Sequence, residues 1–381
     1  MAAEVISQLG VVRSLLSRHG PAPVVADWQR LEPWTVARVR LEGAGHPRQV
    51  IVKWGRDHPD RTRTLTWRLR TELAALRFLS DDLGLRLAPR VVAADPAAEV
   101  IVLEDLFPRT PLDQLLRAEG ATAHAERLAA FAGARGELNA ATAGRAAVYY
   151  ARRAALGPVD AAADRTGRWV GLRAEGIGQA ADFGVAVSGP AESELVSVLE
   201  ELDEPGPFLA FSNGDPEANN VLVHASGDPD PRLIDFEFAG YTHALSDAVC
   251  LHVPGPAWLS IGDAEAGGPA DAYRRALARG VPEAEDDRRY GFGLAAACFS
   301  YMFVRLQRLG AVDGRPPGDH SRLQLVATLE AAARTAAAHG ALPHLAGWAL
   351  RTSGLLRRRW PDADLDLTDP ASFPAYSPRL R

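Results

Sequence analysis

Hydrophobic and polar positions along the first 55 residues change from a helical to a strand-like pattern. Apolar residues recur at the spacing of an amphipathic helix from Val5 to Leu16. Segments rich in β-branched residues follow at 24–31, 35–43 and 48–55, with turn-forming residues between them. The pattern therefore predicts one helix and then three consecutive strands.

Leucines at helical spacing occupy the next segment, residues 62–83, which ends near Gly84. Two further strands are predicted before Leu106, the second of them from Val100 to Leu103. A strand-rich beginning followed by a helical remainder is typical of an α+β protein with two lobes. We predict a small N-lobe at residues 1–106 and a larger, mainly helical C-lobe at 107–381, joined by a hinge at about 104–108.

The predicted C-lobe has helical periodicity over most of its length. The segments with this periodicity are 111–118, 123–142, 192–202, 268–279, 285–308, 319–339 and 341–358. The exception is the segment 219–238, which predicts two short strands around a turn at 227–231. The tail from about residue 361 is acidic and rich in proline, so we expect it to pack loosely.

Composition restricts the class of protein. The chain has 381 residues, of which 47% are hydrophobic and 24% charged, and this excludes a wholly disordered protein. A net charge of −6 argues against nucleic acid as the partner. The longest apolar run, residues 291–304, is too short to span a bilayer, so we expect no membrane partner. Two cysteines and the lack of a signal-peptide pattern predict a cytoplasmic location.

Two residue types are rare, and their positions are informative. Lys53 is the one lysine among 42 basic residues, and only four asparagines occur in the chain. A compact ammonium group on a flexible stem offers what arginine does not, so a lysine retained in an arginine-rich chain indicates a specific use. Three of the four asparagines lie within residues 213–220, where the sequence is Asn-Gly-Asp-Pro-Glu-Ala-Asn-Asn.

The spacing of polar residues in this segment matches the requirements of phosphoryl transfer. That reaction needs a carboxylate beside the acceptor hydroxyl, and Asn and Asp ligands for Mg²⁺ bridging the phosphates. Asp215 and Asn220 are five residues apart, and Asp235 follows twenty residues after Asp215 at the end of a predicted strand. Protein kinases place a base and a metal-binding Asn at the same separation. We therefore interpret Asp215 as the base and Asn220 and Asp235 as metal ligands.

The predicted N-lobe supplies groups that could hold the nucleotide. Lys53 ends the third strand, where a kinase lysine binds the α- and β-phosphates, and Glu72 on the following helix would hold that lysine in place. The backbone of the hinge, at Glu104 and Leu106, would meet the adenine ring. ATP and Mg²⁺ are thus the predicted cofactors.

These motifs resemble those of the aminoglycoside phosphotransferase family, which includes choline kinase-like enzymes. Asn213–Leu222 resembles the family's His-Gly-Asp-x4-Asn loop, and Leu233–Glu237 resembles its Ile-Asp-Phe-Glu motif. Asp247 resembles the downstream aspartate that braces the loop. The resemblance implies a two-lobed protein kinase-like fold and transfer of the γ-phosphoryl group of ATP to a hydroxyl.

The sequence departs from the family pattern at three places. Asn213 replaces the usual histidine, the turn at 31–35 contains no glycine, and Asn139 stands where the family often has histidine. The predicted acceptor is a small hydroxylated molecule, either an antibiotic or a metabolite. Two alternatives stay open: a Ser or Thr of a peptide or protein, and a pseudokinase that binds nucleotide without turnover. The sequence leaves the oligomeric state open.

Overall fold

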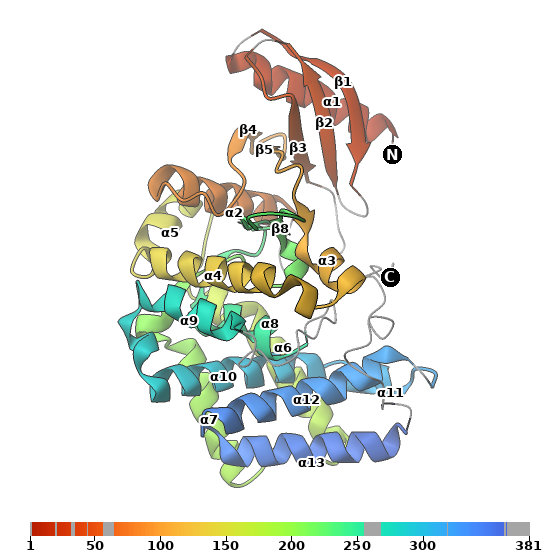
Figure 1. Ribbon diagram of the computed structural model, residues 1–381, viewed down its shortest axis with the longest axis vertical. Coiled ribbons are helices and arrows are strands. Elements are labelled where there is room, and N and C mark those ends of the chain that lie inside the picture. Colours follow the sequence, from red (N-terminus) through yellow and green to blue (C-terminus); the bar gives the residue numbers. More distant parts are fainter. Residues whose placement is uncertain are drawn as a thin grey trace.

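The computed structural model shows a small sheet-containing part above a larger helical part (Figure 1). It describes residues 2–19, 21–31, 35–43, 45–55, 65–254, 268–317, 319–361 and 363. The glycine-free turn noted above falls on residues 32–34, outside the described residues, as does the tail from 364 onward. Among the described residues, no helix combines the length and apolar character needed to cross a membrane.

Five antiparallel strands form the N-terminal sheet. They are β1 (Val24–Arg30), β2 (Val36–Glu42), β3 (Gln49–Trp54), β4 (Val91–Asp95) and β5 (Val100–Glu104), arranged in the order β1-β2-β3-β5-β4. In this register Lys53 lies opposite Val36 on β2 and opposite Ile101 on β5. Lys53 therefore sits on a central strand, whose position is fixed by neighbours on both sides.

Each face of this sheet packs against one helix, because side chains alternate between faces along a strand. Helix α1 (Ala2–Leu16) covers one face, where Val12 and Leu15 form a small core with Val52 and other strand residues. Helix α2 (Leu65–Arg77) packs on the opposite face, together with Leu103 and the main core of the molecule. Lys53 and Ile51 share this second face, the one turned toward the helical part.

The helical part begins after β5 and is built around helix α10. Its helices are α3 (Leu112–Glu119), α4 (Ala125–Thr142), α5 (Ala146–Ala154), α6 (Ala163–Asp182), α7 (Pro190–Asp203), α8 (Val249–His252), α9 (Pro269–Ala278), α10 (Asp287–Leu306), α11 (Leu309–Asp313), α12 (His320–Ala338) and α13 (Pro343–Arg359). Short strands form two further sheets: β6 (Thr110–Pro111), β8 (Val221–Val223) and β9 (Arg232–Leu233) pair in one, and β7 (Leu209–Ser212) pairs with β10 (Gly240–His243) in the other.

The predicted α+β architecture is confirmed: a small antiparallel sheet with packed helices precedes a larger, mainly helical part. Helix α6 was missed by the sequence analysis, because four glycines within it lower its helix propensity. At least one of them is required by packing. A Cβ on Gly176 would lie 1.8 Å from the Phe303 carbonyl oxygen, so glycine allows α6 to approach α10 closely.

Candidate active site

Three residues from separate elements meet at the underside of the sheet. Lys53 Nζ, at the end of β3, lies 2.6 Å from Glu72 Oε1 on α2 and 3.1 Å from Asp235 Oδ1 in the segment after β9. The Glu72 side chain is only 4% exposed and that of Lys53 is 18% exposed. The structure therefore brings the predicted phosphate anchor, its predicted partner and one predicted metal ligand together across 182 residues of sequence.

The charges in this cluster favour a protonated lysine. Burial alone would lower the pKa of the Lys53 ammonium group, but the carboxylates of Asp235 and Glu72 outweigh it and hold the pKa above its ordinary value. Burial raises the pKa of the Glu72 carboxyl, and Lys53 opposes that shift. Lys53 consequently presents a fixed positive charge on the sheet face turned toward the helical part, as binding of a polyphosphate requires.

Glu237 joins the same cluster, although the sequence analysis quoted it only as part of a motif. Burial, followed by the nearby Asp235 carboxylate, raises the pKa of the Glu237 carboxyl to about 7. Arg68 Nη1 on α2 lies 3.5 Å from Glu237 Oε1. Little in the sequence identifies Glu237 as a site residue, because a glutamate at the end of a strand motif is usually solvated.

The loop that holds Asp215 is closed by hydrogen bonds from Asn220. The Asn220 side-chain amide donates to the Asp215 carbonyl at 3.0 Å, and the Ile234 N–H donates to the Asn220 carbonyl at 2.9 Å. Strands β8 and β9 pair with Val221 opposite Leu233, which puts Asn220 and Asp235 at the same end of one hairpin. Asp235 has φ +63°, a left-handed conformation that aspartate tolerates better than most residues.

Asn213 connects the loop that holds Asp215 to the segment that holds Asp235. It is fully buried, and its Oδ1 accepts hydrogen bonds from Arg135 Nη1 at 2.7 Å and from the Asp215 N–H at 3.3 Å. Its amide nitrogen donates to the Ile234 carbonyl at 3.1 Å. One side chain thus ties the residue before Asp235 to the backbone of Asp215. Asparagine can therefore serve as the scaffold of the loop at this position.

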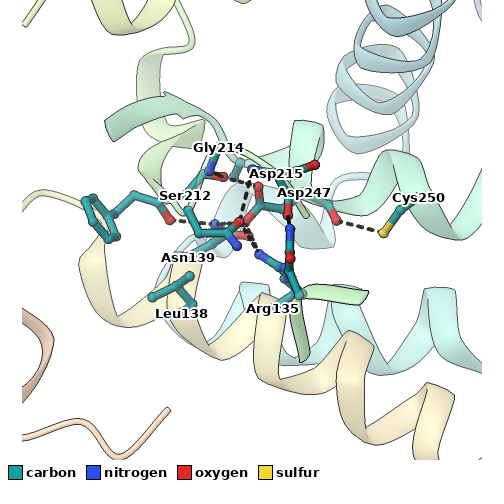
Figure 2. Close-up of polar contacts among 12 residues, drawn as sticks. Arg135, Leu138, Asn139, Ser212, Gly214, Asp215, Asp247 and Cys250 are labelled. Carbon is teal, nitrogen blue, oxygen red and sulfur yellow. Dashed lines mark hydrogen bonds and ion pairs between the residues drawn. The ribbon is translucent and has the colours of Figure 1, made fainter. Parts of the chain in front are cut away.

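Asp247 braces the same loop from below, as the resemblance implied (Figure 2). Its carboxylate accepts hydrogen bonds from the Ser212 hydroxyl and, at 3.2 Å, from the Asn139 amide. Ser212 Oγ in turn accepts a hydrogen bond from the Gly214 N–H at 2.9 Å. Burial raises the pKa of Asp247, while Arg135, whose Nη1 lies 3.9 Å away, opposes the shift. Asn139 acts within this network as a structural residue.

We expect Asn213→Ala to lower the free energy of unfolding by about 3 kcal/mol, since it leaves buried partners such as Arg135 without their hydrogen bonds. Denaturant unfolding measures this loss. Asn219→Ala is the matched control: Asn219 is half-buried, and its side chain donates one hydrogen bond, to Asn220, so the loss should stay below about 1 kcal/mol. Equal losses for the two variants would contradict the assigned role of Asn213.

The predicted hinge has a backbone donor available to a ligand. Leu106 is 6% exposed, and within the described residues its N–H has no hydrogen-bond acceptor, whereas its carbonyl accepts from the Arg109 N–H at 3.1 Å. The Glu104 side chain faces Arg90, with Oε2 3.5 Å from Nε. The Glu104 N–H donates to the Arg90 carbonyl at 2.9 Å, so the contact of the Glu104 backbone with a nucleotide base stays a prediction.

Oxygen donors suited to Mg²⁺ are present in the hairpin. Asn220 uses its amide nitrogen to bind the Asp215 carbonyl, and among the described residues its Oδ1 accepts a hydrogen bond only from Asn219, so this oxygen can also serve as a metal ligand. Asp235 uses one carboxylate oxygen for Lys53. One amide and one carboxylate oxygen fit Mg²⁺, which is bound through few protein ligands, with phosphates and water completing its shell. No cluster of three or more His, Cys, Asp or Glu side chains that could hold a metal ion occurs among the described residues.

Helix α10 contributes polar groups beside Asp215 that the sequence analysis missed. The electrostatic neighbours of Tyr301 include Arg305, Glu217 and Asp215, and burial raises the pKa of its phenol. The Tyr301 hydroxyl is buried and has no hydrogen-bond partner within the part of the chain that is described. Burial, followed by the Asp215 carboxylate, raises the pKa of Glu217 to about 8. The sequence pattern of α10 predicts a buried apolar helix, and nothing in that pattern identifies Tyr301 or Arg305 as a candidate site residue.

No protein-family model matches the sequence, and no curated protein matches it either. The chain is similar to solved structures of kinases. It is 16% identical to a choline/ethanolamine kinase family protein from Mesorhizobium loti, covering 85% of this chain and 93% of that one, with a TM-score of 0.47. A putative aminoglycoside phosphotransferase from Ralstonia eutropha is also 16% identical, with 90% and 98% covered and a TM-score of 0.47. Choline kinase from Streptococcus pneumoniae is 15% identical, with 81% and 94% covered and a TM-score of 0.43.

Proposed function

We propose that the protein is an ATP-dependent phosphotransferase that moves the γ-phosphoryl group of ATP to a hydroxyl of a small molecule. The observation that carries this proposal is the meeting of Lys53, Glu72 and Asp235 beside the loop that holds Asp215 and Asn220. A buried lysine between two carboxylates, next to oxygen donors for Mg²⁺, suits a nucleotide triphosphate.

Each residue has a part in the proposed reaction. Lys53 binds the α- and β-phosphate oxygens, and Glu72 holds its ammonium group in position. Asn220 and Asp235 would hold Mg²⁺, which when bound neutralises charge on the phosphates. The acceptor oxygen forms a bond to the γ-phosphorus while the bond to the bridging β–γ oxygen breaks, so that ADP leaves. Asp215 receives the proton of the acceptor hydroxyl.

The surroundings of Asp215 favour a small acceptor over a peptide. Glu217 and Tyr301 interact electrostatically with Asp215, and Arg305 interacts with both of them; all three residues are half-buried. Half-buried polar groups of this kind suit a compact molecule with hydroxyls. The complete set of Lys53, Asp215, Asn220 and Asp235 argues against a pseudokinase, since a protein that only binds nucleotide does not need Asp215.

The test is ATP consumption by the purified protein with Mg²⁺, with and without a panel of acceptors. The panel includes aminoglycosides, nucleosides, amino alcohols, and peptides that contain Ser or Thr. Acceptor-dependent formation of ADP, lost when Mg²⁺ is removed, is the expected result. Turnover with peptides alone would replace the small-molecule acceptor by a peptide. Tight ATP binding without turnover on any acceptor would favour a pseudokinase.

A further inference from the structure

An ion pair crosses from the sheet to the hinge at the place where a nucleotide base would enter. Arg38 Nε on β2 lies 2.7 Å from Asp105 Oδ2, and Arg38 Nη2 lies 3.3 Å from Asp105 Oδ1. The Asp105 side chain is 5% exposed and also accepts the Phe107 N–H at 3.1 Å. A carboxylate this deeply buried needs paired donors, so the two-pronged contact fixes the guanidinium in one position.

The register of the sheet places Arg38 on the same face as Lys53. Arg38 lies directly opposite Ile51 on β3, and Lys53 is two residues further along that strand. Residues two apart on a strand point to the same face and are separated by about 6.6 Å. The guanidinium therefore lies between Lys53, the proposed phosphate anchor, and Leu106, the hinge residue with the available N–H. A nucleotide bound at both ends would pass beneath it.

On the side of the ion pair away from Lys53, the sheet borders a hollow. The next cross-strand pair is Arg40 with Gln49, and both residues line a hollow of ≈ 510 Å³ together with Phe107. Asp105 also lines this hollow, so the Arg38–Asp105 pair lies at its boundary. The guanidinium also lies near the Phe107 ring, with Cζ 5.7 Å from the ring centroid. A flat cation 31% exposed at this boundary can contact a planar ring.

We propose that Arg38, held in place by Asp105, contacts the base of the bound nucleotide and favours purines over pyrimidines. The inference rests on the proposed function, because it requires a nucleotide with its phosphates at Lys53. A guanidinium against an aromatic ring is attracted to the ring's π-electrons, and the larger purine ring offers more contact area. Sequence reasoning could not locate this residue, because an arginine on a strand usually faces solvent.

The experiment measures dissociation constants for MgATP, MgCTP and magnesium tripolyphosphate on the full-length protein and its variants. Arg38→Met keeps an unbranched stem and removes the guanidinium, so ATP binding should weaken about tenfold. CTP should weaken by less, and tripolyphosphate, which has no base, should be unchanged. Arg38→Lys retains a cation that can pair with Asp105 but lacks the flat group, and its ratio of ATP to CTP affinity should fall in the same direction. Arg40→Met, two residues along the same face, is the control and should leave all three constants unchanged.

Several outcomes would overturn the inference. An unchanged ATP affinity in Arg38→Met would do so while the proposed function stood. An equal weakening of ATP, CTP and tripolyphosphate would assign Arg38 to the phosphates or to hinge structure instead. If thermal unfolding shows that Arg38→Met does not fold, Arg38→Lys decides the test. An unchanged ratio of ATP to CTP affinity in Arg38→Lys would then contradict the inference. A wild-type protein that binds tripolyphosphate but shows no preference between ATP and CTP would also contradict the role of Arg38. Wild-type protein that binds none of the three ligands would overturn the proposed function and this inference with it.

Discussion

Asp215→Asn is expected to reduce acceptor phosphorylation about a thousandfold, because the amide cannot take the proton of the attacking hydroxyl. Nucleotide affinity should stay within about twofold, since Asp215 contributes to the loop through its backbone rather than to the phosphate anchor. Rapid-quench or coupled assays give the turnover, and calorimetric titration with MgATP gives the affinity. A fall in turnover alone would assign Asp215 to the chemical step.

A matched control for this variant lies in the hairpin that follows. Asp228 is exposed in the turn between β8 and β9, and its Oδ1 accepts the Asp230 N–H at 3.2 Å. Asp228→Asn makes the same chemical change outside the site and should leave both turnover and affinity unchanged. The assignment of Asp215 as base fails if Asp215→Asn retains most of the wild-type turnover. It fails equally if this variant loses turnover only because its unfolding midpoint has dropped.

The site residues that could be predicted are those whose residue type and spacing along the chain are typical of phosphoryl transfer. Asp215, Asn220 and Asp235 lie on one loop and one hairpin, so their separation along the chain determines how close together they lie in the structure. Lys53 was found because lysine is otherwise absent from the chain, and Glu72 because a leucine-spaced helix follows that strand. Local structure brings Asp215, Asn220 and Asp235 to one place, whereas the contacts of Lys53 with Glu72 and Asp235 depend on packing between separate segments.

The unpredictable part consisted of contacts between segments far apart in sequence. Arg135 on α4 reaches Asn213 across 78 residues, and Arg38 reaches Asp105 across 67. The chain contains 42 basic residues, nearly all arginine, so nothing in composition distinguishes these two from solvated arginines. Their roles follow from burial and tertiary packing, which a single sequence does not specify. The same holds for α6, in which Gly176 allows the close approach to α10.

Lys53→Arg is expected to lower kcat/KM about a hundredfold although it preserves the positive charge, because the site fits a compact ammonium and a misplacement of about 1 Å is costly. Lys53 Nζ is enclosed by Glu72 at 2.6 Å and Asp235 at 3.1 Å, and its side chain is 18% exposed. A planar guanidinium is wider and longer, so it would displace Asp235 or draw Glu72 out of its buried position. Steady-state kinetics with varied ATP would show the loss in both kcat and KM.

The same position allows a direct check of where the nucleotide binds. Because Lys53 is the single lysine of the chain, an amine-reactive acyl-phosphate derivative of ATP has one side-chain amine to label. Mass spectrometry should find the label on Lys53, and excess MgATP should prevent it. Arg40→Lys is the reverse substitution on the neighbouring strand, at an exposed residue of the same face, and should leave kcat/KM unchanged. Full activity in Lys53→Arg would show that the single lysine reflects codon usage and not a requirement for phosphate binding.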